Sequence, residues 1–253
     1  MKRFTSVLLT LITITFSSVA AQMEEGGLLI WEKYTGINGP IMTEYFQMVK
    51  DKYAPSTGNT YGLYGRSPTI GYRVTPVQTG GLEGVQEILT VRQEVFGEFT
   101  DAEVELWEDA WTSRETMILA NVPDLSLIPD DFGVLSVADN PFVDVLVYFL
   151  KPQEIQTFRE SLARRNELDR ELGADDYIMR VYQGMIGTPS PAFLVMQHYE
   201  NMTDLETGRA RRMQARQAVP EWMEVQRRLM GSAREIERFI LNRNNELSFS
   251  ANR

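Results

Sequence analysis

Hydrophobic and polar residues follow clear local patterns in the second half of the chain. Residues 143–150 form a β-branched and aromatic run of strand length. Pro152 follows as a first-turn residue, and apolar residues then recur at helical spacing until Gly173, which predicts a helix. Residues 177–183 and 192–199 are two further predicted strands, joined by a turn rich in glycine and proline.

A second long helical stretch is predicted after these strands. Thr203 and Glu206 have the spacing of a capping box, so we expect the helix to begin there. A break is expected near Pro220, after which apolar residues again recur at helical spacing. They are Trp222, Val225, Leu229, Ile236 and Ile240. The predicted order is strand, helix, strand, strand, helix, with room for a last short strand.

The first half repeats this order less regularly. Residues 28–34 predict a strand, and Pro40 opens a predicted helix. Residues 55–84 are rich in Gly, Pro, Thr and Tyr and predict one irregular strand with long turns, whereas 87–96 predict another strand. Thr100-Asp-Ala-Glu103 then opens a helix, as the related sequence at Thr203 does in the second half.

Two βαββα units in tandem resemble the ferredoxin-like dimeric α/β-barrel superfamily, in the variant where both units lie on one chain and their sheets face each other. The resemblance covers nearly the whole mature chain and rests on element order and the paired helix starts. It implies an α+β fold with facing antiparallel sheets and helices outside. The superfamily includes cofactor-independent monooxygenases, haem-binding enzymes and proteins without known activity, so the fold leaves function open.

The amino terminus has the pattern of a secretory signal peptide. Lys2 and Arg3 precede an apolar run over residues 4–16, and small residues lead to a predicted cleavage before Gln22. We therefore expect a soluble periplasmic or secreted protein. Residues 1–21 are the predicted signal, 22–120 the first unit, 121–142 a linker and 143–253 the second unit.

Composition narrows the choice of partners and chemistry. The predicted signal removes 2 of the 25 basic residues, so the mature chain carries 23 against 35 acidic residues, a net charge of −12. Nucleic acids and anionic membrane surfaces are therefore poor partners. The chain has no cysteine, which excludes disulfides and thiolate chemistry. Phosphate-loop, dinucleotide, zinc-protease and serine-elbow motifs are also missing, and no carboxylate cluster has metal-ligand spacing.

Strand alternation sorts the second-half side chains into two faces. If the two later strands pair as a hairpin, one face lies under the helices, and its residues are Tyr177, Met179, Val181, Phe193 and Val195. The other face lines the cleft between the sheets, and its residues are Ile178, Arg180, Tyr182, Leu194, Met196 and His198. The neighbouring strand is predicted to add Leu146 and Tyr148 to that cleft.

The single histidine admits three interpretations. His198 could act as a general base on a small aromatic molecule, with Arg180 and Tyr182 orienting the substrate. Alternatively it could be the axial ligand of a haem cofactor. The third interpretation is a hydrogen-bonded residue at a strand end with a structural role.

Three further features have simple structural explanations. Arg92 and Glu94 would alternate on their predicted strand and could form a buried salt link facing the cleft. Four arginines form a stripe in the last helical region that is either a solvated face, paired with the acidic first half, or a docking surface for an acidic partner or a second copy. They are Arg209, Arg211, Arg212 and Arg216. Trp107 and Trp111 are predicted core residues of one helix.

The leading hypothesis is an exported protein that binds a small, largely apolar or aromatic molecule in the cleft between its sheets. The first alternative is an enzyme similar to the cofactor-independent monooxygenases. The second is a structural or interaction protein whose cleft is filled by its own side chains. A homo-oligomer is compatible with each hypothesis.

Overall fold

The computed structural model of the chain describes residues 27–58, 60–77, 80–128 and 140–250. The predicted signal peptide, its cleavage site and residues 129–139 of the predicted linker lie outside the described residues. Within the described ranges, no helix is long and apolar enough to cross a membrane.

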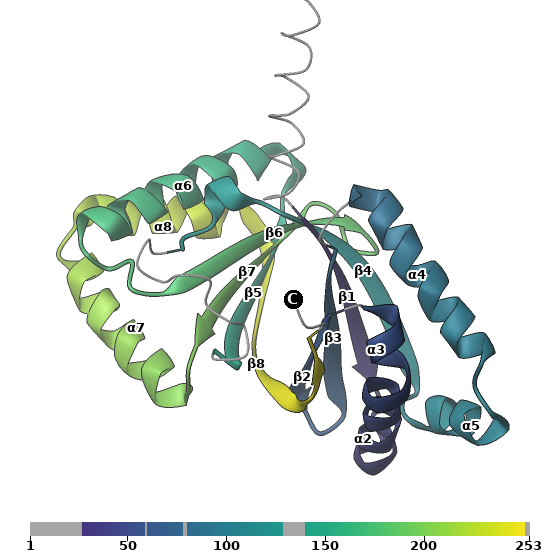
Figure 1. Cartoon of the computed structure of the whole chain (residues 1–253). Helices are drawn as coiled ribbons and strands as arrows, with labels where there is room; N and C mark the ends of the chain where they lie inside the picture. The colour runs from purple at the N-terminus through teal and green to yellow at the C-terminus, as the bar shows by residue number, and fades with distance from the viewer. Residues whose placement is uncertain (1–26, 59, 78–79, 129–139, 251–253) are drawn as a thin grey trace, which may run out of the picture.

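The strands form a closed antiparallel barrel in the order β1-β3-β2-β8-β5-β7-β6-β4 (Figure 1). The first half contributes β1 (Leu28–Thr35), β2 (Tyr61–Ser67), β3 (Ile70–Val77) and β4 (Ser113–Asn121). The second half contributes β5 (Phe142–Leu150), β6 (Ile178–Ile186), β7 (Ala192–Tyr199) and β8 (Ala233–Phe249). Pairing of β2 with β8 and of β4 with β6 joins the two four-stranded sheets. The predicted tandem of facing ferredoxin-like sheets is confirmed.

The helices lie outside the barrel, as predicted (Figure 1). In the first half they are α2 (Gly39–Met48), a π-helical turn η1 (Val49–Tyr53), α3 (Ala54–Thr57), α4 (Gly81–Gly97), α5 (Asp101–Asp109) and a 3-10 turn η2 (Pro123–Leu125). In the second half they are a 3-10 turn η3 (Pro152–Glu154), α6 (Ile155–Glu171), α7 (Met202–Gln217) and α8 (Pro220–Gly231). Each unit therefore has two helices before its last strand, and in the second unit the predicted break near Pro220 separates α7 from α8.

The prediction of a strand over residues 87–96 is wrong, because this segment belongs to helix α4. Gly84, Val85 and Ile88 are the buried positions of α4, and their spacing places them on one helical face against the sheet. The irregular strand predicted over 55–84 is instead the hairpin of β2 and β3.

The end of the chain also differs from the prediction. Helix α8 stops at Gly231, and Ile236 and Ile240 belong to β8, which is much longer than the short strand expected. Strand β8 pairs with β5 on one side and with β2 on the other. These partners are distant in the sequence, so their hydrogen bonds override the local helical spacing of the apolar residues.

One of the two predicted helix caps is confirmed. The Oγ1 atom of Thr100 accepts a hydrogen bond from the Glu103 amide at 3.4 Å, and Glu103 Oε2 accepts one from the Thr100 amide at 2.8 Å. The cap predicted at Thr203 is wrong, because Asn201 caps α7 by accepting from the Asp204 amide at 2.9 Å. Asn201 precedes the helix with extended backbone, where its carboxamide oxygen can reach that amide.

Candidate functional site

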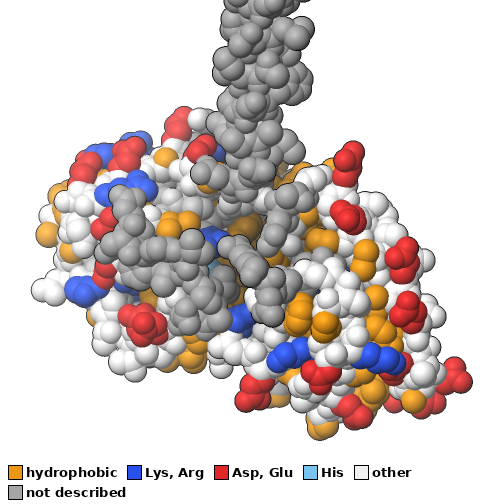
Figure 2. All heavy atoms as spheres, viewed as in Figure 1, with side chains coloured by type: hydrophobic (Ala, Val, Ile, Leu, Met, Phe, Trp, Pro, Cys, Tyr) orange, Lys and Arg blue, Asp and Glu red, His pale blue; other side chains and the backbone are white. Residues whose placement is uncertain are grey.

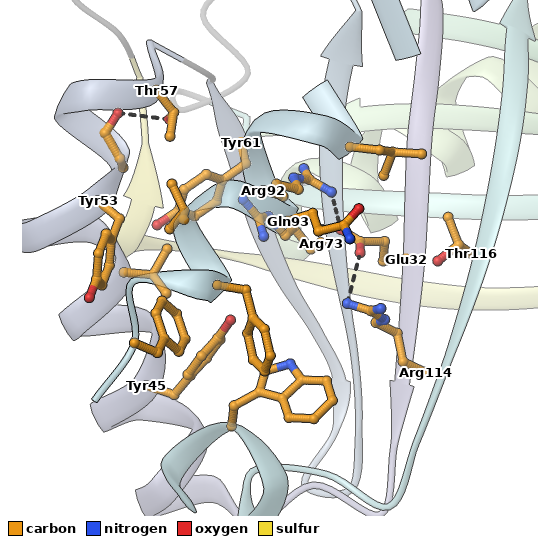
Figure 3. A pocket seen from close by; sticks show the side chains of 17 residues that line it. Glu32, Tyr45, Tyr53, Thr57, Tyr61, Arg73, Arg92, Gln93, Arg114 and Thr116 are labelled. Atoms are coloured by element: carbon orange, nitrogen blue, oxygen red, sulfur yellow. Dashed lines mark hydrogen bonds and ion pairs between the residues drawn. The ribbon is translucent and has the colours of Figure 1, made fainter. Parts of the chain in front are cut away.

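A cavity of about 290 Å³ lies between the outer face of the first sheet and the helices that cover it (Figure 3). Strands β1 to β4 form its floor, and the helical segment 39–57 with α4 and α5 forms its walls. In the second half, this layer is filled by buried side chains that include Phe158, Leu162 and Phe193. The same fold unit is thus tightly packed in one half and hollow in the other.

Three arginines surround Glu32 at the polar end of this cavity. The Glu32 side chain is only 3% exposed, and its Oε2 accepts a hydrogen bond from Arg92 Nη1 at 2.9 Å. Arg73 Nε lies 3.9 Å from the same oxygen, and Arg114 Nη1 lies 3.8 Å from Oε1. Arg92 also donates from Nη2 to Thr75 Oγ1 at 2.6 Å. Figure 3 shows the arginines approaching Glu32 from different sides.

Strand alternation explains how Glu32 reaches this position. Ile30, Glu32 and Tyr34 share the outer face of β1, because successive side chains of a strand point to opposite faces. The register of the sheet then places Arg73 of β3 and Thr116 of β4 beside Glu32. A carboxylate between Ile30 and Tyr34, on an otherwise apolar face of the strand, was the sequence signal that could have revealed this site.

The polar end of the cavity carries a surplus of positive charge. Burial, together with nearby Arg73, lowers the pKa of Arg92 to about 10, while Glu32 opposes that shift. Arg92 therefore stays protonated at neutral pH. Three guanidinium groups against one carboxylate leave a local surplus of two positive charges, in a chain whose net charge is −10. This local balance favours an anionic ligand.

Aromatic rings form the opposite end of the cavity. The Phe96 ring centre lies 5.0 Å from that of Trp107 and 5.2 Å from that of Phe99, and the Tyr53 and Phe99 centres are 4.9 Å apart. Phe96 remains 38% exposed at the rim. Figure 2 shows hydrophobic side chains gathered on this flank, with acidic side chains along the outer edge of α4. The cavity therefore combines a cationic floor with an apolar, ring-lined wall.

A π-helical turn shapes one wall. In η1 the amide of Ala54 donates to the carbonyl of Val49, which is the wider spacing that defines this helix type. Val49, Tyr53 and Ala54 all line the cavity. Single π-helical turns inside longer helices occur frequently at functional sites. The apolar spacing of this segment predicted a helix but gave no sign of the turn.

Tyr61 adds a buried hydroxyl to the floor. Its Oη atom has no hydrogen-bond partner among the described residues, and the guanidinium carbon of Arg73 lies 4.4 Å from the ring centre. Burial raises the pKa of Tyr61 to about 12, although Arg73 opposes that shift. The hydroxyl is therefore protonated at neutral pH and can donate to a bound anion.

The residues predicted from the second-half hairpin lie inside the barrel. Tyr182, Leu194 and Met196 belong to its interior core, and the strand register places Arg180 beside Met196 and Ile178 beside His198 on the same face. Trp31, Tyr72 and Phe239 face the same space from the other strands, with the Tyr72 and Phe239 rings stacked at 5.6 Å. The predicted cleft is thus largely occupied by core side chains.

Leu146 and Tyr148 are not part of this interior face, so their predicted placement is wrong. Tyr148 belongs to the cluster under the helices, and Leu146 packs against it. On β5 the interior positions are Val143, Val145 and Val147. Asp144 is the single charged residue of β5, and the others are apolar or aromatic, so the sequence offered no regular polar alternation to indicate which face points inward.

His198 is buried in the barrel, and its environment opposes the charged form. Burial, with a further contribution from Arg180, lowers the pKa of His198 to about 3. Its Nε2 atom has no hydrogen-bond partner among the described residues. A group with such a pKa is neutral at physiological pH and is a weak general base, because effective bases have a pKa near the working pH.

The haem interpretation fits His198 in one respect only. A neutral imidazole with an unpartnered Nε2 is chemically suited to axial ligation. However, the interior residues Leu194, Met196, Val143 and Leu241 are buried core side chains, and a macrocycle beside His198 would require them to move. We therefore derive no chemistry through haem at this position. The described residues also contain no group of three His, Asp or Glu side chains placed to hold a metal ion.

Arg92 and Glu94 do not form the predicted salt link. They lie on α4 rather than on a strand, and Arg92 pairs with Glu32, whereas Glu94 is exposed. On a helix, residues two apart point to different sides, so these two side chains cannot meet.

The arginine stripe of α7 pairs within the second half and not with the acidic first half. Arg209 contacts Asp144 at 2.8 Å, and Arg216 forms two hydrogen bonds to the buried carboxylate of Asp169, at 2.8 and 2.7 Å. Arg211 and Arg212 both contact Asp176. Each arginine of the stripe therefore has an acidic partner within the second half. Trp107 and Trp111 are partly buried in the aromatic cluster of the first half, with ring centres 6.1 Å apart.

Comparison with known proteins gives no match to a family model or to a curated relative. Solved structures do match. An anthrone oxidase-like protein has a TM-score of 0.56 at 13% identity, covering 90% of this chain and 94% of its own. A candidate monooxygenase of Lactobacillus acidophilus NCFM has a TM-score of 0.52 at 14% identity, with coverages of 86% and 94%. A chlorite dismutase of Candidatus Nitrospira defluvii has a TM-score of 0.52 at 13% identity, with coverages of 88% and 94%.

These matches extend over nearly the whole of both chains and agree with the strand order. The chain has the fold of a tandem dimeric α+β barrel. At identities of 11 to 14% for the matches above a TM-score of 0.5, the likeness concerns the fold alone. The function of this α+β barrel must therefore be argued from its own cavity.

Proposed function

We propose that this α+β barrel protein binds a small organic anion with an apolar, aromatic body in the cavity beneath α4. The observation that carries the proposal is the group formed by Arg73, Arg92 and Arg114 around the single carboxylate of Glu32, at the end of a cavity walled by aromatic rings. The proposal keeps a small ligand with an aromatic body but adds a negative charge to it, and it moves the site from the barrel interior to the outer face of the first sheet.

The arginines account for the anionic part of the ligand. A guanidinium group presents several N–H donors in a plane, and this geometry suits a carboxylate or phenolate. Arg114 is the most accessible of the three, with 44% of its side chain exposed, whereas Arg73 and Arg92 are 11% and 17% exposed. Arg114 can therefore meet an incoming anion while the other two arginines stay anchored near Glu32.

The volume and the rings account for the apolar part. About 290 Å³ is close to the lower limit of ordinary ligand pockets, roughly 300 Å³, so the ligand must be small. Phe96, Phe99 and Trp107 can pack against a ring of the ligand in offset or edge-to-face arrangements.

Oxidation of the bound molecule, as in the cofactor-independent monooxygenases, is the second candidate function. The cationic floor would favour the ionised form of a phenol or an enol, since fixed donors stabilise a developing oxyanion. The earlier assignment of His198 as the base, with Arg180 and Tyr182, fits this function poorly because His198 is a weak base at neutral pH. Oxygen consumption with a panel of phenols would test this candidate.

Two variants test the binding proposal. Arg114→Gln removes a 44%-exposed arginine beside buried Glu32, and Arg238→Gln removes a 42%-exposed arginine beside buried Asp144 at a distant site. Calorimetric titration with 1-naphthoate and with the neutral 1-naphthamide should give a preference for the anion in the parent protein. We expect Arg114→Gln to weaken naphthoate binding by about tenfold, as one charged hydrogen bond is lost, and Arg238→Gln to leave it unchanged. Equal binding of acid and amide would contradict the proposal.

Export belongs to the proposal as well. The cationic start, apolar run and small residues before Gln22 support a periplasmic or secreted location. Amino-terminal sequencing of the protein from fractionated cells should begin at Gln22. A homo-oligomer remains a prediction that light scattering of the purified protein would test.

A further inference from the structure

Two arginines point into the barrel near its single histidine. Arg180 of β6 lies on the same face as Tyr182 and His198, and Arg243 of β8 lies on the same face as the interior residue Leu241. The register places Arg243 directly beside Tyr64 of β2. These side chains lie outside the cavity of the first half.

The two guanidinium groups belong to one electrostatic neighbourhood. The register pairs Tyr64 with Arg243, and burial raises the pKa of Tyr64 to about 12 against the opposing charges of Arg243 and Arg180. Arg180 also acts on Tyr182 and on His198. A Cβ atom on Gly62 would lie 3.3 Å from both Arg243 Nε and Tyr64 Oη, so a side chain at this glycine would crowd the space beside them.

Neither arginine has a carboxylate partner. Among the described residues, no Asp or Glu oxygen lies within 4.0 Å of Arg180 or Arg243. Arg243 Nη1 donates to the uncharged amide oxygen of Asn245 at 2.5 Å. Among the described residues, the Nε atoms of both arginines are buried without a hydrogen-bond partner, and so is His198 Nε2. By contrast, Arg216 and Arg238 each contact a buried aspartate through two nitrogens, at 2.7 to 2.9 Å.

Buried donors and charges of this kind are unfavourable unless something satisfies them. An unpaired charge in a protein interior costs several kcal/mol, and each unsatisfied polar group costs about 1–3 kcal/mol. Arg180 and Arg243 together present two positive charges with several N–H donors, and Tyr64 and Tyr182 add hydroxyl donors. This donor set matches a small oxyanion.

We propose that the barrel interior is a second binding site, which holds a small oxyanion such as phosphate or sulfate between Arg180 and Arg243. Tyr64, Tyr182 and the neutral imidazole of His198 line this site. The anion neutralises the charge that no carboxylate of the described residues neutralises there, and it therefore stabilises the closed barrel. The site is independent of the proposed organic-anion cavity, with which it shares no residue.

The single histidine provides a direct probe of this site. In protein labelled with ¹⁵N-histidine, the one imidazole should show a saturable chemical-shift change on titration with sodium phosphate at constant pH and ionic strength. Arg180→Gln and Arg243→Gln should each weaken this response at least tenfold. Arg114→Gln, which alters the other cavity, should leave the response unchanged, and Arg238→Gln serves as the control for loss of a charge elsewhere.

The outcomes separate the alternatives even if one variant folds poorly. A phosphate response in the parent protein that persists in Arg243→Gln and Arg180→Gln would overturn the proposal, as would no response in the parent protein itself. A response lost in Arg114→Gln alone would place the anion in the first-half cavity and would equally refute the second site. Sodium chloride at matched ionic strength should produce a smaller shift than phosphate, since the bidentate oxyanion geometry is absent.

Discussion

Arg92 donates from Nη1 to Glu32 Oε2 at 2.9 Å, and this bond connects helix α4 to the central region of β1 across the cavity. The first turns of α4 pack directly on the sheet through Val85 and Ile88. Further along the helix, Arg92 bridges to the sheet through its long side chain. The cavity therefore exists because a salt link, and not a layer of apolar side chains, supports this part of α4.

Glu32→Gln should destabilise the protein by about 3 kcal/mol, because it leaves three guanidinium groups without their buried carboxylate. Urea unfolding followed by circular dichroism would measure the loss. The double variant Glu32→Gln/Arg92→Met should be less destabilised than the sum of the two single variants, because the partners interact directly. Additive losses of unfolding free energy in the double variant would show that the interaction between Glu32 and Arg92 contributes little to stability.

The low pKa of His198 should make the folded protein less stable in acid. Its folded pKa of about 3 lies below the ordinary value of 6.5, so the unfolded chain binds a proton that the folded chain does not. This proton uptake costs the folded protein no stability above about pH 6.5, and the loss of unfolding free energy grows as the pH falls toward 3. Between pH 7 and pH 5, the parent protein should lose about 2 kcal/mol more than His198→Gln. Identical pH dependence of unfolding in both proteins would contradict the burial argument.

Binding of an aromatic anion should change tryptophan fluorescence through Trp107, which lines the cavity and is one of four tryptophans in the chain. We expect 1-naphthoate to alter the emission of the parent protein and to alter that of Trp107→Phe much less, although this variant still binds. Trp222→Phe, which lies in the second half beside Asp169, is the matched control. An emission change that is lost in Trp222→Phe would show that the ligand binds in the second half and would contradict the proposed site.

Gly187 should tolerate substitution poorly. Its φ angle is +74°, and an added Cβ would lie 2.3 Å from the carbonyl oxygen of Thr116 on β4. Gly173 has a similar φ of +58° but no atom within 4 Å of that position. Gly187→Ala should therefore cost about 3 kcal/mol and Gly173→Ala about 1 kcal/mol, because only the former adds a steric collision to the backbone strain. Thermal unfolding of the two variants would compare these costs.

The second half was more predictable than the first, for identifiable reasons. Residues 192–199 match β7, and their alternation correctly placed Leu194, Met196 and His198 on the interior face. In the first half, the apolar residues of 87–96 suited either a strand or a helix over a short window. The segment is helical because Val85 and Ile88, near the beginning of α4, are buried against the sheet on one helical face.

The cavity itself was not predictable, because its polar residues come from separate elements. Glu32, Arg73 and Arg114 lie on three different strands, and Arg92 lies on a helix that was predicted as a strand. Only the register of β1 with β3 and β4 brings the first three together. Sequence patterns identify which face of a strand a residue occupies, but they do not show which strand lies next to it.

The sequence by itself determined the alternating strands, the Thr100 helix cap, the tandem order of the units and the absence of thiol chemistry, since each depends on neighbouring residues or on composition. The tertiary structure alone decided three further points. It converted the end of the chain into β8 through pairing with β2 and β5. It left a cavity in the helical layer of the first half, and it brought Arg180 and Arg243 into the barrel with no carboxylate partner among the described residues. Each of these depends on hydrogen bonds and packing between segments far apart in the chain, which local patterns do not encode.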